Sequence, residues 1–500
     1  MQWLNKVVDE LVNRHPEGEV IVSSGVSPSG TYHVGTLREV LTADAIAAEL
    51  KRRGRTSRHI HVVDDLDVFR KVPANVPPNF KQYLGRTLCD IPAPDGSEQS
   101  YADYFFNDFL TAAKRLNLQM DVMHSHQKYR SGFMVPAIEK TLAGQTQIRQ
   151  TLETVSGHKL DDHWSPVQVN EDGYLKNRQF VSINTSAKTI FYLDVNNKEQ
   201  IISYAKGDVK LNWRVDWPAR WWLLKVMAEP FGRDHATRGG SYDTGAEIIR
   251  KVFGADPPLP IPYHFINAVG ETKKMSKSAG LVVSSSEIVQ VLPPEIVRYF
   301  ILRFAPAKQL FFDQVGVTKL IDDYAAETDK QLLDICSSGL QPTVSKIPFS
   351  HLAASYQAAL KDPDKTLEII GRTEYQKIVA SDAAIIKREL AFINQWLEKW
   401  APQEAKFELL QKVDQSKFND SEKDFLAALG QKIAKAPQDA DGDWFHKAIY
   451  EIKEADKLTP EQVFKPLYRA LIGKDSGPRA GWFLSILPRD WLVKRLRLED

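Results

Sequence analysis

A polar loop near the start of the chain carries residues suited to holding the phosphates of a nucleotide. The segment SGVSPSGTYHVG at 24–35 contains one proline and three glycines, which shape a loop and leave its backbone open to a ligand. At its end His33 can donate toward phosphates, while Gly35 leaves room for a base that passes over the start of a helix. The alternative is a simple turn with a capping histidine, and the short pattern alone does not decide between them.

A second polar loop, ETKKMSKSAG at 271–280, carries Lys273, Lys274 and Lys277. Flexible ammonium groups on such a loop can follow charge as it moves onto pyrophosphate during in-line attack on the α-phosphorus of a nucleotide. The alternative is a solvated basic loop. The nucleotide interpretation is favoured because the first loop stands upstream and α/β segments surround both.

The elements around the first loop predict a parallel sheet. VIVSSG at 20–25 is typical of a short buried strand, and apolar residues recur at helical spacing from about Leu37 to Leu50. HIHVVDD at 59–65 is a second β-branched strand that ends in carboxylates. Strand, helix and strand form a βαβ unit, and ligands of such sheets gather at the carboxyl ends of the strands. We therefore expect the site there.

The predicted secondary structure changes twice along the rest of the chain. From about 92 to 213 the pattern is mixed, with a helix at 104–116 and β-prone pieces at 179–183 and 189–195, which indicates an insertion. From 217 to about 310 the α/β character returns, with a helix at 246–253 and a strand at 263–269 that would complete the sheet. Beyond about 320 helical periodicity dominates, most clearly in AAIIKRELAFINQWLEKW.

Composition narrows the class of protein. With Cys89 and Cys336 as the only cysteines, one chain can build neither a disulfide framework nor a thiolate zinc cage, which favours a reducing cytoplasm. The acidic Asp9 and Glu10 argue against a secretory signal, and we expect no membrane segment. A net charge of +1 excludes indiscriminate coating of nucleic acid. KRRGR at 51–55 could form a local contact patch or simply a solvated helix end.

Several motifs resemble one family. HVGT at 33–36 and KMSKS at 274–278 resemble the two signature motifs of class I aminoacyl-tRNA synthetases, and SPSGTYHVGTLRE is similar to the first motif of class I lysyl-tRNA synthetases. Further segments resemble that lysyl family in the same order: DDLDVFRKVP at 64–73, KLNWRVDWPARW at 210–221, FGRDHATRGGSYDTG at 231–245 and GPRAGWFL at 477–484.

The resemblance implies an α/β fold: a Rossmann-type parallel-sheet catalytic domain with an inserted connective domain, followed by an all-helical C-terminal anticodon-binding domain. The predicted bounds are 1–95 and 214–315 for the two halves of the catalytic domain, 96–213 for the insertion and 316–500 for the helical domain. Within that last domain Trp396, Trp400, Arg479 and Trp482 are candidates for contact with unstacked bases, although core packing or surface charge would also explain each one.

The resemblance also implies the chemistry. The lysine carboxylate attacks ATP with Mg2+ assistance, lysyl-adenylate forms, and the terminal ribose 2′-hydroxyl of lysine tRNA takes the lysyl group. His33, Lys274 and Lys277 are the implied catalytic residues. The implied ATP-binding residues are Ser29, Gly30, His33, Gly35, Thr36, Gly232, Asp234, Lys274 and Lys277.

Lysine as the substrate needs a separate argument, because an ammonium group left unpaired in a dry pocket is costly and needs a carboxylate or aromatic faces. The resemblance places Gly25, Ser27, Trp213, His235 and Tyr263 around lysine. Asp216 is our own addition, since WRVDW at 213–217 offers both kinds of group; it could equally be a turn residue, and at least two of the nearby tryptophans could be ordinary core.

Two departures from the family are visible. Thr36 stands where the lysyl family usually has asparagine, and this shorter donor would reach phosphate only through water. Family members often carry cysteine pairs in the insertion, and this chain has none there, so we expect no metal and no structural zinc.

Two alternatives remain open. Glutamyl- and glutaminyl-tRNA synthetases share the class I signatures but would need a cationic or amide-reading pocket. A synthetase-like tRNA-binding protein without activity would bind tRNA and lack lysine-dependent exchange, and the intact signature residues argue against it.

Overall fold

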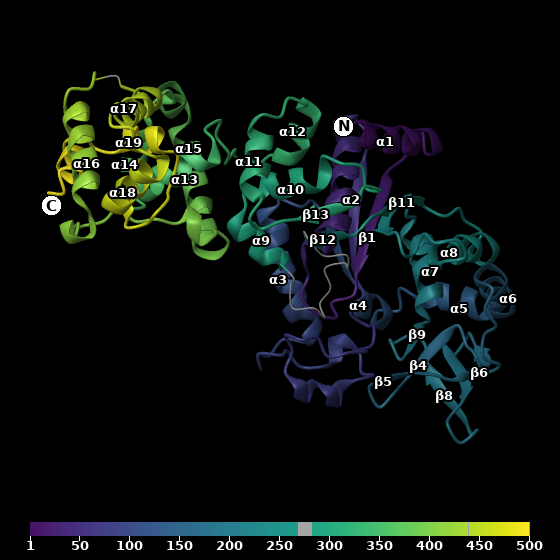
Figure 1. Ribbon diagram of the computed structural model, residues 1–500. Helices are drawn as coiled ribbons and strands as arrows, with labels where there is room; N and C mark the ends of the chain where they lie inside the picture. The colour runs from purple at the N-terminus through teal and green to yellow at the C-terminus, as the bar shows by residue number, and fades with distance from the viewer. Residues whose placement is uncertain (269–282, 439, 500) are drawn as a thin grey trace. The chain divides into compact units, whose positions relative to one another are not determined.

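The computed structural model describes residues 1–268, 283–438 and 440–499 (Figure 1). Two compact units are present, and each is described by itself. The first consists of Met1–Val289, Val297–Phe312 and Asp329–Gly339, and the second of Gln290–Ile296, Asp313–Thr328 and Leu340–Asp500.

A five-stranded parallel sheet organises the first unit. Its strand order is β11-β10-β1-β2-β3, with bounds Leu259–Tyr263, Ala228–Gly232, Val20–Val26, Ser57–Val63 and Asp121–His124. The chain leaves β1 toward β2 on one side and later returns to add β10 on the other. Strand order therefore reverses at β1, and in open α/β sheets ligands bind at the carboxyl ends of the strands at such a reversal.

The predicted βαβ unit is confirmed. β1 and β2 are joined by α2 (Val34–Arg52), which lies beside both strands (Figure 1). The other described α-helices that belong wholly or partly to the first unit, outside the excursion described next, are α1 (Gln2–Arg14), α3 (Tyr101–Arg115), α8 (Ser241–Ile248), α9 (Ser285–Val291), α10 (Pro294–Leu302) and α12 (Lys330–Ser337).

Between β3 and β10 the chain makes a long excursion from the main sheet. Its helices are α4 (Ser125–Arg130), α5 (Val135–Ala143), α6 (Gln145–Ser156) and α7 (Trp213–Leu224). Its strands are β4 (Val167–Glu171), β5 (Tyr174–Asn177), β6 (Gln179–Asn184), β7 (Thr189–Leu193), β8 (Glu199–Ser203) and β9 (Val209–Leu211). They form two antiparallel three-stranded sheets, β5-β4-β9 and β6-β7-β8.

Two elements differ from the sequence-based bounds. β3 lies inside the segment 96–213 predicted as an insertion, yet it pairs with β2 in the main sheet. β3 has only four residues, of which the first two are exposed, so it contains no hydrophobic run by which sequence analysis could recognise a strand. α12 lies inside the predicted C-terminal domain but belongs to the first unit.

The single strand predicted at 263–269 is wrong. β11 ends at Tyr263, and β12 (Ile266–Ala268) instead pairs with β13 (Leu310–Phe312) in a separate two-stranded sheet. The break occurs because the backbone N–H of His264 donates to Pro306 O and therefore leaves the ladder of the main sheet. Val269 lies outside the described residues. The helix predicted at 246–253 is longer: α8 (Ser241–Ile248) continues into a π-helical turn at Ile249–Phe253.

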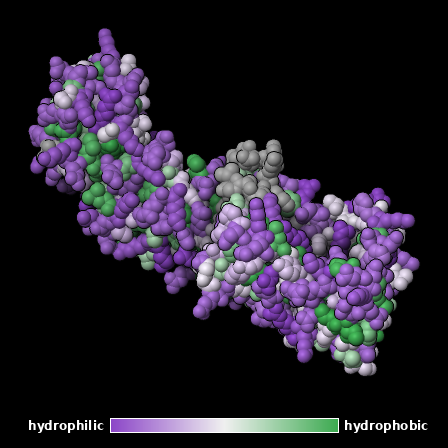
Figure 2. Space-filling model, turned by 90° about the horizontal axis from the view of Figure 1, so that it is seen from below, coloured by the Kyte–Doolittle hydropathy of each residue, from purple (hydrophilic) through white to green (hydrophobic). Residues whose placement is uncertain are grey.

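The second unit is helical, as predicted. Its helices are α11 (Val317–Ala325), α13 (Phe349–Ala358), α14 (Pro363–Ile370), α15 (Gln376–Lys399), α16 (Asp420–Ala434), α17 (Gly442–Ala455), α18 (Pro460–Ile472), α19 (Ala480–Ile486) and α20 (Arg489–Leu496). Their core is built on buried side chains such as Phe425, Leu467 and Phe483. Among the described residues, no helix combines the length and the apolar character needed to cross a bilayer. The face shown in Figure 2 is mostly hydrophilic, with hydrophobic residues in separate smaller areas.

A buried ion pair fixes α2 in the first unit. The Arg298 guanidinium lies 2.7 Å from Asp44 Oδ2 on α2, and it also donates to the carbonyl oxygens of Leu116 and Ile335. Arg298 is fully buried and Asp44 nearly so. Since three elements meet at one guanidinium, this contact holds the helix that begins at the candidate site.

We predict that Arg298→Ala destabilises the protein by about 3–5 kcal/mol, because it leaves the Asp44 carboxylate buried and unpaired. Urea unfolding measures the loss. The matched control is Arg58→Ala, an exposed arginine 3.2 Å from Glu19, which should change stability by about 1 kcal/mol or less. Equal effects from the two variants would contradict the role given to the buried pair.

Candidate active site

His33 closes the N-terminus of α2. It is the N-cap residue, with extended backbone, and its Nδ1 accepts a hydrogen bond of 3.0 Å from the backbone N–H of Gly35. A Cβ on residue 35 would stand only 2.7 Å from a carbon of the His33 ring, so glycine there lets the ring fold over the helix end. This local contact explains why residue 35 is glycine without reference to a ligand.

A cavity with a volume of about 650 Å³ lies at this edge of the sheet. Four segments line it: the loop after β1, the start of α2, the loop after β2 between Asp67 and Pro73, and the segment after β11. The predicted site residues among its lining are Gly25, Ser27, Ser29, His33, Gly35, Thr36 and Tyr263. Because all of them come from the carboxyl ends of strands or the helix they feed, the cavity occupies the place where the strand order reverses.

The described residues on either side of the segment 269–282 lie at this cavity or beside its lining. Before the segment, Ile266 lines the cavity. After it, the backbone N–H of Val34 donates to Val283 O at 3.2 Å, and His33 forms a β-bridge with Ser284. Lys274 and Lys277 themselves lie outside the described residues.

Two smaller cavities of about 230 and 250 Å³ share Gly25 with the large one. Their common wall is aromatic: the His235 ring lies edge-on to Trp213 and Trp217, with centroids 5.5 and 5.6 Å away. Gly232 and Asp234 line the 250 Å³ cavity. Together the three cavities make a continuous set of walls around the end of β1.

Glu39 is a buried carboxylate in this wall. Its oxygens accept hydrogen bonds from the backbone N–H of Gly25 at 2.7 Å and from the Tyr263 hydroxyl at 2.8 Å. Burial raises the pKa of Glu39 to about 8. Both of these donors are neutral, so among the described residues this carboxylate has hydrogen bonds but no cation beside it.

Glu229 is a second buried carboxylate with neutral hydrogen-bond donors, and it lies beside the aromatic wall. It accepts hydrogen bonds from the indole N–H groups of Trp217 and Trp221, and burial raises its pKa. Among the described residues, three cations line these cavities: Arg220 lies 3.0 Å from Asp216 and 3.8 Å from Asp64, Arg70 lies 2.6 Å from Asp67, and Lys71 lines the large cavity only. The walls of the two smaller cavities, whose arginines are already paired, therefore favour a ligand with positive charge.

Asp216 does not take the place predicted for it. It is fully buried, accepts a hydrogen bond from the Tyr129 hydroxyl at 2.5 Å and pairs with Arg220. It lines none of the three cavities. A carboxylate on the inner face of α7 that already holds a guanidinium cannot also serve a ligand, so this prediction is corrected. Gly30 also lies outside the lining of the three cavities.

The comparisons with known proteins agree with this architecture. A family model described as "tRNA synthetases class I (K)" matches residues 1–343, and one described as "Anticodon binding domain" matches residues 380–498. Lysine–tRNA ligase 1 of Methanosarcina acetivorans is 34% identical over 99% of this chain and 98% of its own length. The lysine–tRNA ligases of Archaeoglobus fulgidus and Thermococcus kodakarensis are 33% and 32% identical, over 99% and 100% of each chain.

The chain belongs to the class I lysyl-tRNA synthetase family.

A cavity of about 360 Å³ lies in the helical unit of this synthetase. Arg479 and Trp482, two of the predicted base-contact candidates, line it together with His351 and Tyr375. The His351 ring lies between Tyr375 and Trp482, with centroids 4.7 and 4.2 Å away. The other two candidates, Trp396 and Trp400, are buried and not in this lining.

Sequence reasoning about the synthetase site missed the cavity-lining Glu39, Asp64, Asp67 and Glu229. A signal for Glu39 was present. It ends the motif SPSGTYHVGTLRE, and the four positions after it, Val40 to Ala43, are apolar or small. An acidic residue in such a surrounding is expected to face either a partner or a site.

We predict that Glu39→Gln stabilises the synthetase at alkaline pH. The pKa of Glu39 is raised from 4.5 to about 8, so the folded state holds its proton more tightly than the unfolded chain. Below pH 4.5 Glu39 is protonated in both the folded and the unfolded state, so it does not lower the free energy of unfolding. As pH rises to 8 it removes stability, by about 1.4 kcal/mol per pH unit at most. Urea unfolding should show a gain for the variant at pH 8.5 that shrinks toward pH 5; a gain independent of pH would contradict the shift.

Proposed function

We propose that this protein activates L-lysine with ATP and transfers it to the terminal adenosine of lysine tRNA in the cytoplasm. A lysine carboxylate oxygen bonds to the α-phosphorus and pyrophosphate leaves. The ribose 2′-hydroxyl then attacks the lysyl carbonyl and AMP leaves. The observation that carries the proposal is Glu39: a buried carboxylate with neutral donors only, in the same cavity as the loop that ends at His33.

ATP occupies the large cavity and brings Mg2+ with it. Ser29, His33, Gly35 and Thr36 at the start of α2 face its phosphates and base, where backbone N–H groups and the helix dipole favour anions. Gly232 and Asp234 border the ribose from the end of β10. Gly30 acts through the shape of the loop rather than through contact.

Lys274 and Lys277 belong to the segment 269–282, and of the described residues beside this segment Ile266 lines the cavity and Ser284 bridges to His33. Lys277 is seven residues from Ser284, and an extended chain spans at most about 3.3–3.6 Å per residue, so it has the reach to contact the pyrophosphate. These two lysines stabilise charge on the leaving group.

Lysine fits the smaller cavities. Its ammonium group meets Glu39 or Glu229, and its methylenes pack on Trp213 and the His235 ring, with Gly25, Ser27 and Tyr263 completing the wall. Glutamate would place a carboxylate beside two buried carboxylates, which is strongly unfavourable. The charge of the wall thus favours lysine over the glutamate and glutamine alternatives.

Aminoacylation of a lysine tRNA transcript tests the assignment of the reaction. We expect His33→Ala and Lys277→Ala each to lower kcat/KM by about 10²–10³-fold, because each removes a group that stabilises transition-state charge. The exposed His158→Ala serves as the control. Charging by glutamate or glutamine in place of lysine, or unaltered rates in both variants, would refute the proposal.

A second test addresses the lysine pocket. Glu39→Gln should raise KM for lysine roughly 30-fold or more, since loss of one member of a buried charge pair costs about 2 kcal/mol or more. KM for ATP should change little. Glu98→Gln, at an exposed glutamate, is the matched control. An unchanged KM for lysine in Glu39→Gln would show that Glu39 does not bind the ammonium group and would assign this role to Glu229.

An unstacked base of the tRNA enters the cavity of the helical unit. The Nε2 atom of His351 and the Nε1 atom of Trp482 are buried and have no hydrogen-bond partner among the described residues. Burial lowers the pKa of His351 to about 3, so its ring is neutral. Aromatic faces, two unused polar atoms and the Arg479 guanidinium are the groups that recognise a base.

For this cavity we expect Arg479→Ala and Trp482→Ala to raise KM for tRNA roughly tenfold, because base stacking contributes about 1–3 kcal/mol. KM for lysine should stay constant. Arg497→Ala, at an exposed arginine of the same unit, controls for loss of general positive charge. A tRNA KM equally raised by all three variants would show that only charge matters.

A further inference from the structure

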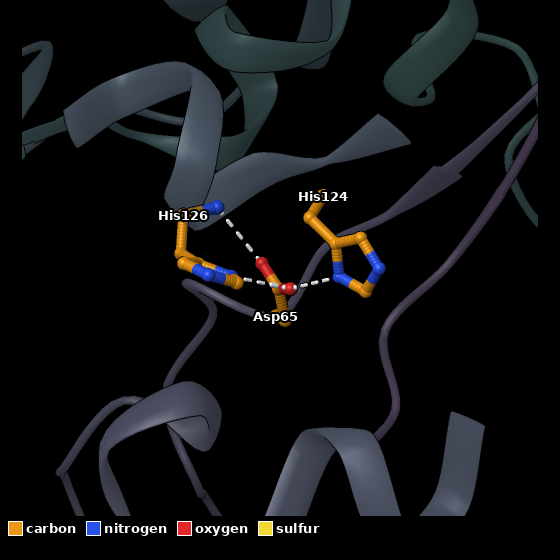
Figure 3. Close-up of side chains that lie close together, drawn as sticks. All are labelled: Asp65, His124 and His126. Atoms are coloured by element: carbon orange, nitrogen blue, oxygen red, sulfur yellow. Dashed lines mark hydrogen bonds and ion pairs between the residues drawn. The ribbon is translucent and has the colours of Figure 1, made fainter. Parts of the chain in front are cut away.

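A carboxylate and two imidazoles converge beyond the carboxyl ends of β2 and β3, and none of the three residues lines the cavities of the candidate active site. Asp65 follows β2, and His124 and His126 stand where β3 passes into α4 (Figure 3). The Asp65 Oδ2 atom lies 2.7 Å from His124 Nδ1 and 2.6 Å from His126 Nδ1. The three ligand-type atoms all lie within 4.8 Å of one another.

The geometry points to a binding site for a first-row divalent metal ion, with Zn2+ as the best fit, ligated by Asp65, His124 and His126. Two imidazoles and one carboxylate are a ligand set that suits zinc and its neighbours, whereas Mg2+ and Ca2+ prefer oxygen. This departs from the expectation that the chain binds no metal, which rested on the absence of cysteine pairs alone.

The carboxylate is already oriented for one-point ligation. The backbone N–H of His126 donates to Asp65 Oδ1 at 2.8 Å, which leaves Oδ2 as the atom that faces both rings. Asp65 is fully buried, and the backbone N–H of Cys89 holds its carbonyl oxygen at 2.9 Å. A ligand fixed in this way by hydrogen bonds is typical of protein metal sites.

The required movement is small. Ligand atoms around a tetrahedral zinc ion with bonds of about 2.0–2.1 Å stand roughly 3.3 Å apart, so each ring must withdraw by about 0.6–0.7 Å. The side chains of His124 and His126 remain 19% and 18% exposed, which gives them room to move and gives an ion a route of entry. Ligation through Nδ1 requires each ring to be neutral with its proton on Nε2, and any proton in excess of this passes to solvent water.

The charge balance also favours a cation. With both imidazole rings neutral, as ligation requires, the cluster carries a net charge of −1, and a divalent ion converts this to +1. The fourth position is open to water. Because Asp65 adjoins Asp64, which lines a cavity of the candidate active site, a metal here would fix the loop between β2 and that cavity.

Calorimetric titration of the chelator-treated full chain with Zn2+ tests the inference. We expect one ion per chain and a rise in Tm. His124→Gln and His126→Gln should each weaken binding by at least about tenfold, while the exposed His158→Gln leaves it unchanged. Co2+ in place of Zn2+ should give the visible absorption of a tetrahedral site in the unmodified protein only.

Glutamine can still donate a hydrogen bond to Asp65, so it separates a metal site from a hydrogen-bonded cluster. The metal site predicts that metal-free Tm is nearly the same in the variants and the unmodified chain, and that only the Zn2+-dependent rise is lost. No Zn2+-dependent rise in the unmodified chain, or equal Zn2+ binding in all variants, would overturn the inference. Because the readouts are binding and Tm, failure here leaves the proposed aminoacylation untouched.

Discussion

The candidate site depends on one constraint: Glu39 is buried, and none of the described residues places a cation beside it. Helix α2 buries three acidic residues, Glu39, Asp44 and Glu49. Asp44 is paired with Arg298, and Glu49 receives hydrogen bonds from Arg52 and Arg53 that hold its pKa near 2 against the effect of burial. Glu39 alone faces a cavity, where its known donors are an amide and a phenol. The helix therefore pairs two acids with arginines, while the third has, among the described residues, hydrogen bonds but no cation beside it.

The fold explains why that third acid meets a nucleotide loop. Strand order reverses at β1, so the loop after β1 and the end of β10 diverge and leave a crevice. α2 begins at the same crevice, with His33 folded over its first turn, and Glu39 lies one to two turns further along. The groups that we propose to bind phosphate and ammonium thus stand on one helix, at a spacing set by helical geometry rather than by flexible loops.

The sequence predicted those parts in which local pattern and chemistry coincide. The opening strand, the loop ending at His33 and the helix after it are local features, and their order relative to 271–280 carried the family assignment. Asp216 failed because a carboxylate between tryptophans looks the same whether it faces a ligand or, as here, Arg220 and Tyr129. Only tertiary structure distinguishes the two cases.

The adjacent pair Asp64 and Asp65 illustrates the same limit. Both residues follow β2 directly, yet Asp64 lines a cavity while Asp65 meets His124 and His126. The two histidines lie about 60 residues further along the chain, His124 at the end of the short edge strand β3 and His126 at the start of α4. Convergence across parallel strands cannot be read from spacing, which is why the cluster was not foreseen.

Proton release on binding of L-lysine tests the central claim most directly. Calorimetry at pH 7 in buffers of different ionisation enthalpy counts the protons exchanged. Since the pKa of Glu39 is about 8 in the free protein, an arriving ammonium group should displace about one proton, and Glu39→Gln should abolish that release. The same proton count in the variant and the unmodified protein would contradict the claim that Glu39 receives the lysine side chain.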